Sequence, residues 1–187
     1  MIVVLNKRKK TDNIYKEYGE DCLIIDVTSK APDAFVRLSP FYPHGNIPIP
    51  NSKATSECVE GVWQGLKVFE NEGVSLKSFK NKTGKNIKRT VRKLGVPKGH
   101  QLGIDSSELL GYLAARKRIF LPTYQYMLTN YCEDLIHKLR SLSENSTVIL
   151  LDYTTNGDIY NLKTPLSHAQ LVKAYCESKY DKLVDEE

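Results

Sequence analysis

The sequence lacks the features that mark membrane, metal-binding and disulfide-rich proteins. No apolar run among its 187 residues approaches the about 20 residues that a membrane-spanning helix needs. No Cys-x-x-Cys pair is present, so the pattern of a zinc knuckle or a thioredoxin motif is missing. We therefore expect buried, reduced thiols rather than disulfides or metal ligands. The cysteines are Cys22, Cys58, Cys132 and Cys176.

A signal-peptide pattern is missing as well. Residues 2–5 are apolar and the basic Lys7 follows them, whereas a signal peptide places its charge first and a longer apolar stretch after it. From this order we expect a cytoplasmic protein with no membrane partner.

Acidic residues are missing between Glu72 and Asp105, in a chain whose formal net charge is +5. Basic side chains of this kind commonly face phosphate, so residues 80–98 predict a DNA or RNA partner or the phosphates of a nucleotide. The alternative is a solvated helix face without a partner. The basic residues are Lys80, Lys82, Lys85, Lys88, Arg89, Arg92, Lys93 and Lys98.

Helical periodicity outweighs strand patterns, so we expect a helix-dominated α+β fold with a small sheet, in a single domain of residues 1–187. Short apolar runs predict strands at residues 2–5, 22–27, 34–38 and 147–152. Caps and breakers predict helices at residues 56–71, 86–94, 106–120 and 122–142, and a last helix capped by Thr164 with Pro165 at its first position. Near its start, we expect His168 to make a structural hydrogen bond rather than to act in catalysis.

The helix expected at residues 56–71 carries two stripes. An apolar stripe at helical spacing should face the core: Val59, Val62, Leu66 and Phe69. A second stripe combines a carboxylate, the only tryptophan of the chain, an amide and an ammonium: Glu60, Trp63, Gln64 and Lys67. These groups suit a nucleotide sugar, because they offer a stacking surface, hydrogen bonds to hydroxyls, a cation for phosphate and an acid/base group. A mixed surface with Trp63 packed on a neighbouring element is the alternative.

The order of short motifs around this helix resembles that of a known family. The motifs are Leu-Ser-Pro-Phe-Tyr-Pro at 38–43, Glu-Gly-Val-Trp-Gln-Gly-Leu-Lys at 60–67, Thr-Val-Arg-Lys-Leu-Gly at 90–95, the strand at 148–152 and Asn-Gly-Asp at 156–158. Together they resemble the YbiA-like, or NADAR, family, whose helix reads Glu-His-x-aromatic-Gln-x-x-Lys. The resemblance covers residues 36–160; it leaves residues 1–35 as unmatched N-terminal strands and 164–181 as a C-terminal helix. The family's histidine after the glutamate is Gly61 here.

The resemblance implies a fold, an activity and a set of site residues. The activity is hydrolysis of the N-glycosidic bond of an ADP-ribose-like or ribose-phosphate nucleotide, on a free nucleotide or on modified nucleic acid, without a metal or a cofactor. The implied catalytic residues are Glu60, Asp158 and, as the less favoured second acid, Asp152. The implied substrate-binding residues are Ser39, Phe41, Trp63, Gln64, Lys67, Arg92 and Tyr112.

Two other functions remain open from the sequence. Residues 80–98 also suit a nucleic-acid-binding module with tyrosines for stacking. A catalytically inactive ADP-ribose sensor would keep the binding residues without turnover. Glu60 discriminates among the three hypotheses, because only an N-glycosidase needs its carboxylate for turnover.

Overall fold

The computed structural model describes residues 1–185, and these residues form two compact units. Unit 1 comprises residues 1–39 and 132–185, and unit 2 comprises residues 40–131. Helices predominate over short strands in both units, which confirms the predicted α+β class. No helix among residues 1–185 is long and apolar enough to cross a lipid bilayer. The unit boundaries do not coincide with residues 36 and 160, and the single domain stays a prediction.

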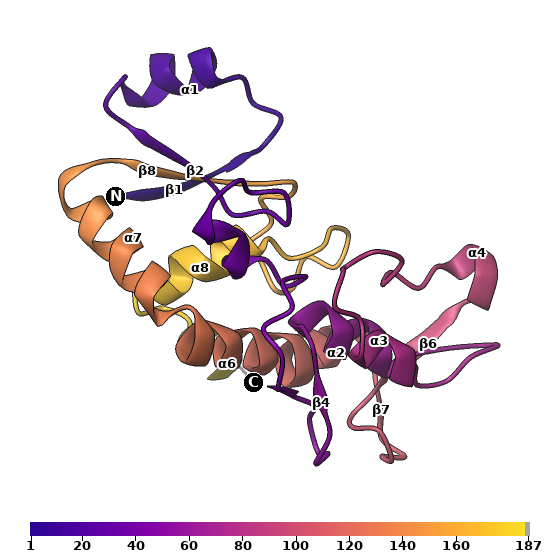
Figure 1. The fold of residues 1–187 in the computed structure, drawn as a ribbon. Helices are drawn as coiled ribbons and strands as arrows, with labels where there is room; N and C mark the ends of the chain where they lie inside the picture. Colours follow the sequence, from indigo (N-terminus) through magenta and orange to yellow (C-terminus); the bar gives the residue numbers. More distant parts are fainter. Residues whose placement is uncertain (186–187) are drawn as a thin grey trace. The chain divides into compact units, whose positions relative to one another are not determined.

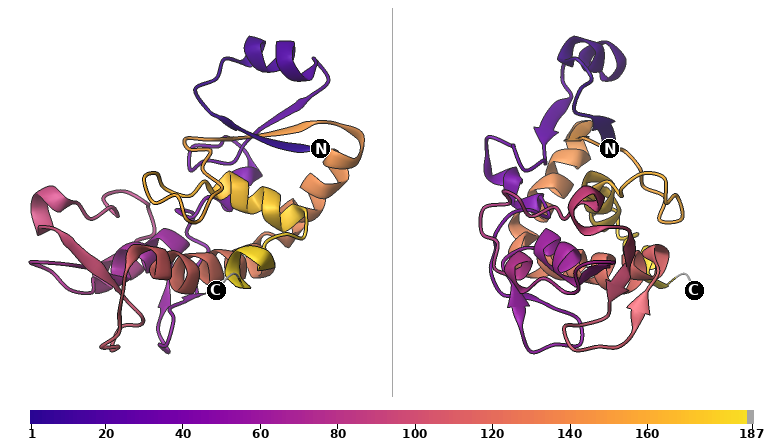
Figure 2. Two further views of the ribbon diagram at one scale, coloured as in Figure 1. Left: turned by 180° about the vertical axis from the view of Figure 1, so that it is seen from behind. Right: turned by 90° about the vertical axis from the view of Figure 1, so that its right-hand side faces the viewer.

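Unit 1 is built on a three-stranded parallel sheet with the strand order β1-β8-β2 (Figure 1). Its helix α1 lies on one side of this sheet, and α7 and α8 lie on the other side (Figure 2). The elements are β1 (Ile2–Asn6), α1 (Thr11–Tyr18), β2 (Leu23–Asp26), the 3-10 helix η1 (Ala34–Leu38), α7 (Glu133–Asn145), β8 (Val148–Asp152), α8 (His168–Cys176) and α9 (Asp181–Asp185).

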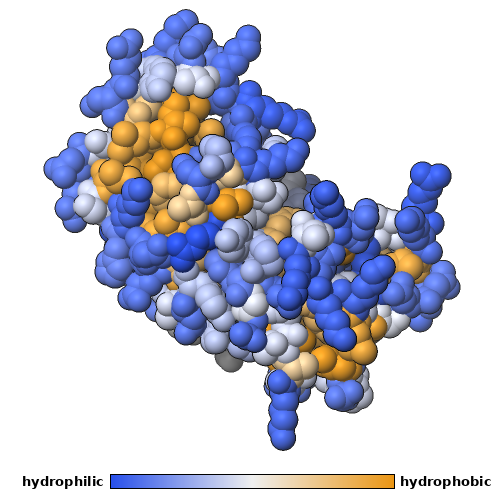
Figure 3. Space-filling model, in the orientation of Figure 1, coloured by the Kyte–Doolittle hydropathy of each residue, from blue (hydrophilic) through white to orange (hydrophobic). Residues whose placement is uncertain are grey.

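The two faces of this sheet differ in how well they are covered. Val148 and Leu150 are fully buried on the face toward α7 and α8. On the other face, Ile14 of α1 packs with Cys22 and Ile149. Neighbouring apolar side chains on that face are only partly buried: Val3, Leu5, Tyr18, Ile24 and Leu151. Figure 3 shows apolar surface between α1 and the strands of unit 1.

Unit 2 combines short helices with two small antiparallel sheets, β3-β4 and β5-β6-β7. Its elements are β3 (Ile47–Pro48), β4 (Thr55–Ser56), α2 (Val59–Leu66), β5 (Lys67–Phe69), α3 (Leu76–Phe79), α4 (Val91–Leu94), β6 (Pro97–Gln101), β7 (Leu109–Leu110), α5 (Tyr112–Ala115), the π-helical segment η2 (Arg116–Phe120) and α6 (Leu121–Tyr131). The core of this unit lies between α2, η2 and α6, where Val62, Leu66, Ile119 and Tyr124 are fully buried.

Several predicted elements are confirmed. The strands expected at residues 2–5, 22–27 and 147–152 are present as β1, β2 and β8. The described cysteines are all buried and reduced, as expected. The last helix is also present, although it begins at His168 and is capped by Ser167, whose Oγ accepts a hydrogen bond from the amide of Gln170 at 3.3 Å. Thr164 was therefore the wrong cap.

Other predicted elements were wrong. The strand expected at residues 34–38 is a 3-10 helix, because the Asp33 carboxylate accepts a hydrogen bond from the amide of Phe35 at 2.9 Å and starts a helical turn there. The helix expected at residues 86–94 is reduced to α4, since Asn86 has a positive φ of 55°. The one expected at 106–120 begins only at Tyr112, after β7. The helix expected at 122–142 is interrupted at Cys132, whose ψ of 13° is not helical.

Candidate functional site

The candidate site is built on α2, which is shorter than the sequence predicted. Cys58 caps this helix, because its Sγ accepts a hydrogen bond from the amide of Gly61 at 3.2 Å. The apolar stripe is buried as expected, but the helix ends at Leu66 and the chain enters β5 without a loop. Lys67 is therefore the first residue of a strand, where it pairs with His100 of β6.

Close packing of α2 against α3 requires two glycines on the helix. A Cβ atom on Gly65 would lie 2.1 Å from the ring of Phe79. A Cβ atom on Gly61 would lie 2.4 Å from Oγ of Ser56 and 2.9 Å from the carbonyl oxygen of Ser78. No side chain fits at position 61 without movement of these groups, and this accounts for the glycine where the resembled family has histidine.

Glu60 and Gln64 are buried together on α2, with 8% and 7% of their surfaces exposed. Nε2 of Gln64 donates a hydrogen bond to Oε1 of Glu60 at 2.9 Å, and Oε1 of Gln64 accepts one from the amide of Arg89 at 3.1 Å. Because a backbone N–H can only donate, the second bond fixes the orientation of the Gln64 amide. The amide of Glu60 donates to the carbonyl oxygen of Pro40 at 2.8 Å. The Glu60 carboxylate is thus held in one place by its neighbours.

Arg89 ties the basic segment to the end of α2, a role that the sequence did not reveal. Its guanidinium donates hydrogen bonds to the carbonyl oxygens of Gln64 at 3.0 Å, of Lys67, and of Gly73 at 2.7 Å. A cation at a helix C-terminus is stabilised by the unpaired carbonyl groups there. Arg92, which the resemblance places near the phosphates, is exposed on α4, and within residues 1–185 it makes no hydrogen bond or ion pair.

Lys67 presents a partly buried ammonium group beside Glu60. Burial lowers the pKa of Lys67, the nearby Glu60 carboxylate opposes this shift, and Arg89 adds to it. The ammonium lies 5.2 Å from the centroid of the Phe69 ring. Within the described part of the chain, it has no hydrogen-bond or ion-pair partner. An anion would therefore find this cation unpaired and partly desolvated, where its attraction is stronger than in water.

Aromatic rings surround Trp63 on three sides. The imidazole of His100 lies against the indole with 3.8 Å between the ring centroids, and the rings of Tyr112 and Phe120 meet it edge-on at 5.7 and 5.6 Å. Trp63 is therefore packed on neighbouring elements and half-buried. Tyr112, which the resemblance implies as a substrate-binding ring, lies beside Trp63 with 39% of its surface exposed.

His100 was not predicted as a site residue, yet it is the most unusual side chain of the cluster. It is 2% exposed, and both of its ring nitrogens are buried without a hydrogen-bond partner among residues 1–185. Burial, together with the charges of Lys67 and Arg89, lowers the pKa of His100 to about 3. The imidazole is therefore neutral at physiological pH. No sequence signal marks this residue, because its neighbours are set by the pairing of β5 with β6.

A buried arginine follows at the π-helical segment η2. Arg116 is 2% exposed, its guanidinium lies 4.7 Å from the centroid of the Tyr112 ring, and Nη2 donates a hydrogen bond to the Tyr112 hydroxyl at 3.4 Å. Single π-helical turns inside α-helices are frequent at functional sites. Arg116 thereby holds the ring that lies beside Trp63.

The remaining predicted site residues lie in unit 1, apart from Phe41, which is in unit 2 beside the loop at 84–88. Ser39 is buried and follows η1. Asp158 is exposed, and its Oδ1 accepts a hydrogen bond from the amide of Tyr160 at 2.9 Å, as in an ordinary turn. The structure brings Glu60, Trp63, Gln64, Lys67 and Tyr112 together within unit 2.

Asp152 anchors a buried hydrogen-bond network in unit 1. Its Oδ2 accepts hydrogen bonds from Oγ of Ser167 at 2.7 Å and from the amide of Ala169 at 3.3 Å, and it lies 3.1 Å from Nδ1 of His168. The other nitrogen of His168 donates to the carbonyl oxygen of Val27 at 2.8 Å. The expected structural hydrogen bond of His168 is present. Since Ser167 contacts the aspartate rather than Nε2 of the histidine, these residues do not form a nucleophilic triad.

A family model described as a family of unknown function (DUF6939) matches residues 6–172. The chain belongs to this family. The matched range contains the residues that come together in unit 2, which we call the Glu60 cluster (Glu60, Trp63, Gln64, Lys67, Arg89, His100, Tyr112 and Arg116), and the Asp152 network of unit 1. No curated protein matches the chain. The family description names no activity, so the resemblance to the YbiA-like family stays a prediction.

Proposed function

We propose that this chain is an N-glycosidase that hydrolyses the bond between ribose C1′ and a base nitrogen in an ADP-ribose-like or ribose-phosphate nucleotide. The observation that carries the proposal is that a buried, positioned carboxylate on α2 lies near a cation that directly follows this helix and has no ion-pair partner among residues 1–185. Glu60 is held by Gln64, and burial lowers the pKa of Lys67 while the nearby charge of Glu60 partly offsets this shift.

Glu60 supplies the base for the proposed step. As the C1′–N bond breaks, its electron pair leaves with the base and positive charge develops on the ribose ring. A carboxylate beside the ring stabilises that charge and takes one proton from the attacking water. The water oxygen bonds to C1′ and the ribose gains a hydroxyl group there. The proton held by Glu60 passes to the departing base nitrogen, or to solvent where the base leaves as a neutral molecule, as nicotinamide does from NAD⁺, and the Glu60 carboxylate is restored. The step needs no oxidant or reductant.

Lys67 and the aromatic rings would bind the rest of the nucleotide. The Lys67 ammonium pairs with a phosphate, which fixes C1′ relative to Glu60. Trp63 and the exposed part of Tyr112 offer ring surface for the sugar or the base. Asp158 and Asp152 belong to unit 1, and the proposal assigns the base role to Glu60 alone.

The proposal is tested by incubating the protein with free nucleotides (NAD⁺ and ADP-ribose-linked guanosine) and with ADP-ribosylated guanine in DNA, with products identified by mass spectrometry. The key variant is Glu60→Gln, which keeps an acceptor oxygen for Nε2 of Gln64 while removing the base. The matched control is Glu57→Gln, which removes the same charge from the residue that lies 3.5 Å from Lys82. We expect equal release of base from wild type and E57Q, and release lowered by about 10²–10⁴-fold in E60Q.

The inactive sensor predicts a different pattern. It binds ADP-ribose with saturation and releases no product from any substrate, with or without the Glu60 carboxylate. Saturable binding without product in wild type would therefore replace the glycosidase with the sensor.

A further inference from the structure

The second feature of unit 2 is a basic hollow on the surface at α3. Its volume is about 630 Å³, and it is open to solvent. The hollow is lined by Leu76, Lys77, Lys80, Asn81, Lys82 and Thr83. We propose that this surface binds the phosphodiester backbone of a nucleic acid.

The charges of the hollow are largely uncompensated. Lys82 lies 3.5 Å from the Glu57 carboxylate, but within residues 1–185 the ammonium groups of Lys77 and Lys80 have no ion-pair partner. The same holds for Lys85, which lies next along the chain. The sequence has no acidic residue between Glu72 and Asp105, so among the described ion pairs Glu57 alone offsets a charge of this hollow, that of Lys82. Several unpaired cations in a concave surface attract polyanions.

The loop that presents these lysines is held in a defined conformation. Oδ1 of Asn81 accepts hydrogen bonds from the amides of Thr83 at 3.0 Å and of Gly84 at 2.8 Å, and its Nδ2 donates to the carbonyl oxygen of Lys85 at 2.9 Å. Gly84 adopts a positive φ of 68°, which a glycine tolerates without strain. A fixed loop places its cations without a large loss of conformational entropy on binding.

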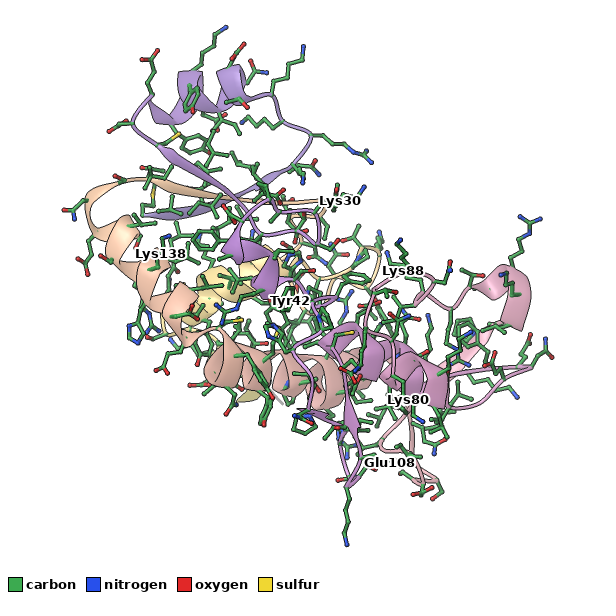
Figure 4. All side chains as sticks on the ribbon, viewed as in Figure 1. Lys30, Tyr42, Lys80, Lys88, Glu108 and Lys138 are labelled. Carbon is green, nitrogen blue, oxygen red and sulfur yellow. The ribbon has the colours of Figure 1, made fainter. Side chains whose placement is uncertain are left out.

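The arrangement fits a polymer better than one nucleotide. Lysines continue along the chain past the hollow through Lys85 to Lys88; Figure 4 labels Lys80 and Lys88 among them. The Lys88 ammonium lies 5.6 Å from the centroid of the Phe41 ring. Five lysines within residues 77–88 are more cations than the phosphates of one nucleoside diphosphate require. Leu76 leaves 58% of its surface exposed at the hollow and offers an apolar contact for an unstacked base. The proposal uses no residue of the Glu60 cluster, so it stands or falls independently of the glycosidase.

The test measures binding of the 187-residue chain to labelled oligonucleotides by fluorescence anisotropy. The oligonucleotides are single-stranded DNA, single-stranded RNA and a DNA duplex of one sequence. The variant is K77E/K80E, and the matched control is K16E/K30E, which makes the same charge change on exposed lysines of unit 1. Affinity is measured between 50 and 200 mM salt (about the range over which phosphate contacts are most evident). Circular dichroism checks that both variants fold.

We expect wild type and K16E/K30E to bind at least one oligomer equally, with K77E/K80E weakened at least tenfold (roughly the effect of losing two phosphate contacts). The slope of log affinity against log salt should become shallower by about 1.4 in K77E/K80E, since each phosphate contact on a single strand contributes about 0.7. Preference for one oligomer identifies the source of the backbone. Equal binding by K77E/K80E, no binding by wild type, or equally tight competition by free ADP would overturn the proposal.

Discussion

The imidazole of His100 lies against the indole of Trp63, with 3.8 Å between the ring centroids, and neither of its nitrogens has a hydrogen-bond partner in the described structure. A buried histidine of this kind contributes ring surface to the packing of Trp63, but its two unpaired nitrogens lower the stability of the fold. This relationship connects the small sheet β5-β6-β7 with the face of α2 that carries Glu60 and Gln64.

His100 makes unit 2 sensitive to acid. The pKa of its imidazole is lowered to about 3 by burial, so between pH 6.5 and 3 the unfolded chain binds a proton that the folded chain does not. Stability therefore falls as the pH falls through this range, by about 1.4 kcal/mol per pH unit. His100→Phe keeps a ring against Trp63 and should remove this part of the pH dependence.

The measurement is urea unfolding followed by Trp63 fluorescence, which reports on unit 2 because the chain has one tryptophan. At neutral pH, H100F should be as stable as wild type or more stable, since no hydrogen bond is lost. Parallel pH profiles for the two proteins would contradict the assignment of a neutral, unpaired His100.

The His168–Asp152 pair should have the opposite pH dependence. Its hydrogen bonds and charge attraction to Asp152 outweigh burial and raise the pKa of His168, while the same contacts lower the pKa of Asp152. The stabilising effect of charged His168 is complete below its unfolded pKa of about 6.5 and is lost as the pH rises through the raised value. The contribution of Asp152 is present above about pH 3.9 and is lost on further acidification.

His168→Gln should therefore destabilise unit 1 by about 3–5 kcal/mol at pH 6, because it removes the cation that faces the buried Asp152 carboxylate. The difference from wild type should shrink as the pH is raised, and far-ultraviolet circular dichroism in urea measures it. A loss that stays constant from pH 6 to 9 would show that His168 is neutral in the folded protein.

Gly65 should not tolerate a side chain. Gly65→Ala places a Cβ atom 2.1 Å from the Phe79 ring and forces α2 and α3 apart, at a cost of about 1–3 kcal/mol. Gly73→Ala is the matched control, because a Cβ atom there meets nothing within 4 Å. The urea midpoints of the two variants are measured by Trp63 fluorescence. Equal midpoints for Gly65→Ala and Gly73→Ala would refute the close packing of α2 against α3.

Arg89 should matter for stability more than Arg92. Arg89→Lys keeps the charge but cannot reach three carbonyl groups at once, so it should lower the free energy of unfolding of unit 2 by about 1.5–3 kcal/mol. Arg92→Lys on the exposed helix α4 should change it by less than about 0.5 kcal/mol. An equal effect of both substitutions would contradict the anchoring role of Arg89.

The parts of the fold that could be predicted from the sequence are those with strong local patterns. The apolar run at residues 148–152 is a central strand, and Val59, Val62 and Leu66 face the core of unit 2 as their spacing indicates. The end of α2 could not be predicted. Residues 67–69 continue the helical pattern, but pairing with β6 draws them into a strand, and that partner lies about thirty residues away.

The candidate site shows the same division. Glu60, Trp63 and Gln64 lie on α2 at the spacing that the sequence indicates. Lys67 follows the helix as the first residue of β5 and still lies near Glu60. His100 and Arg89 reach the cluster through strand pairing and through loop conformation, for which the sequence has no periodic signal. The same limit applies to Gly61, because its close contact with Ser56 and Ser78 depends on tertiary packing.

The most direct test of the central claim measures binding and turnover on the same preparations of wild type and Glu60→Gln. Binding of ADP-ribose is followed by Trp63 fluorescence, and release of base from the cleaved nucleotide is followed by mass spectrometry. We expect unchanged affinity and a turnover rate lowered by about 10²–10⁴-fold in E60Q, the range for loss of a general base. Equal rates of base release by wild type and E60Q would contradict the account.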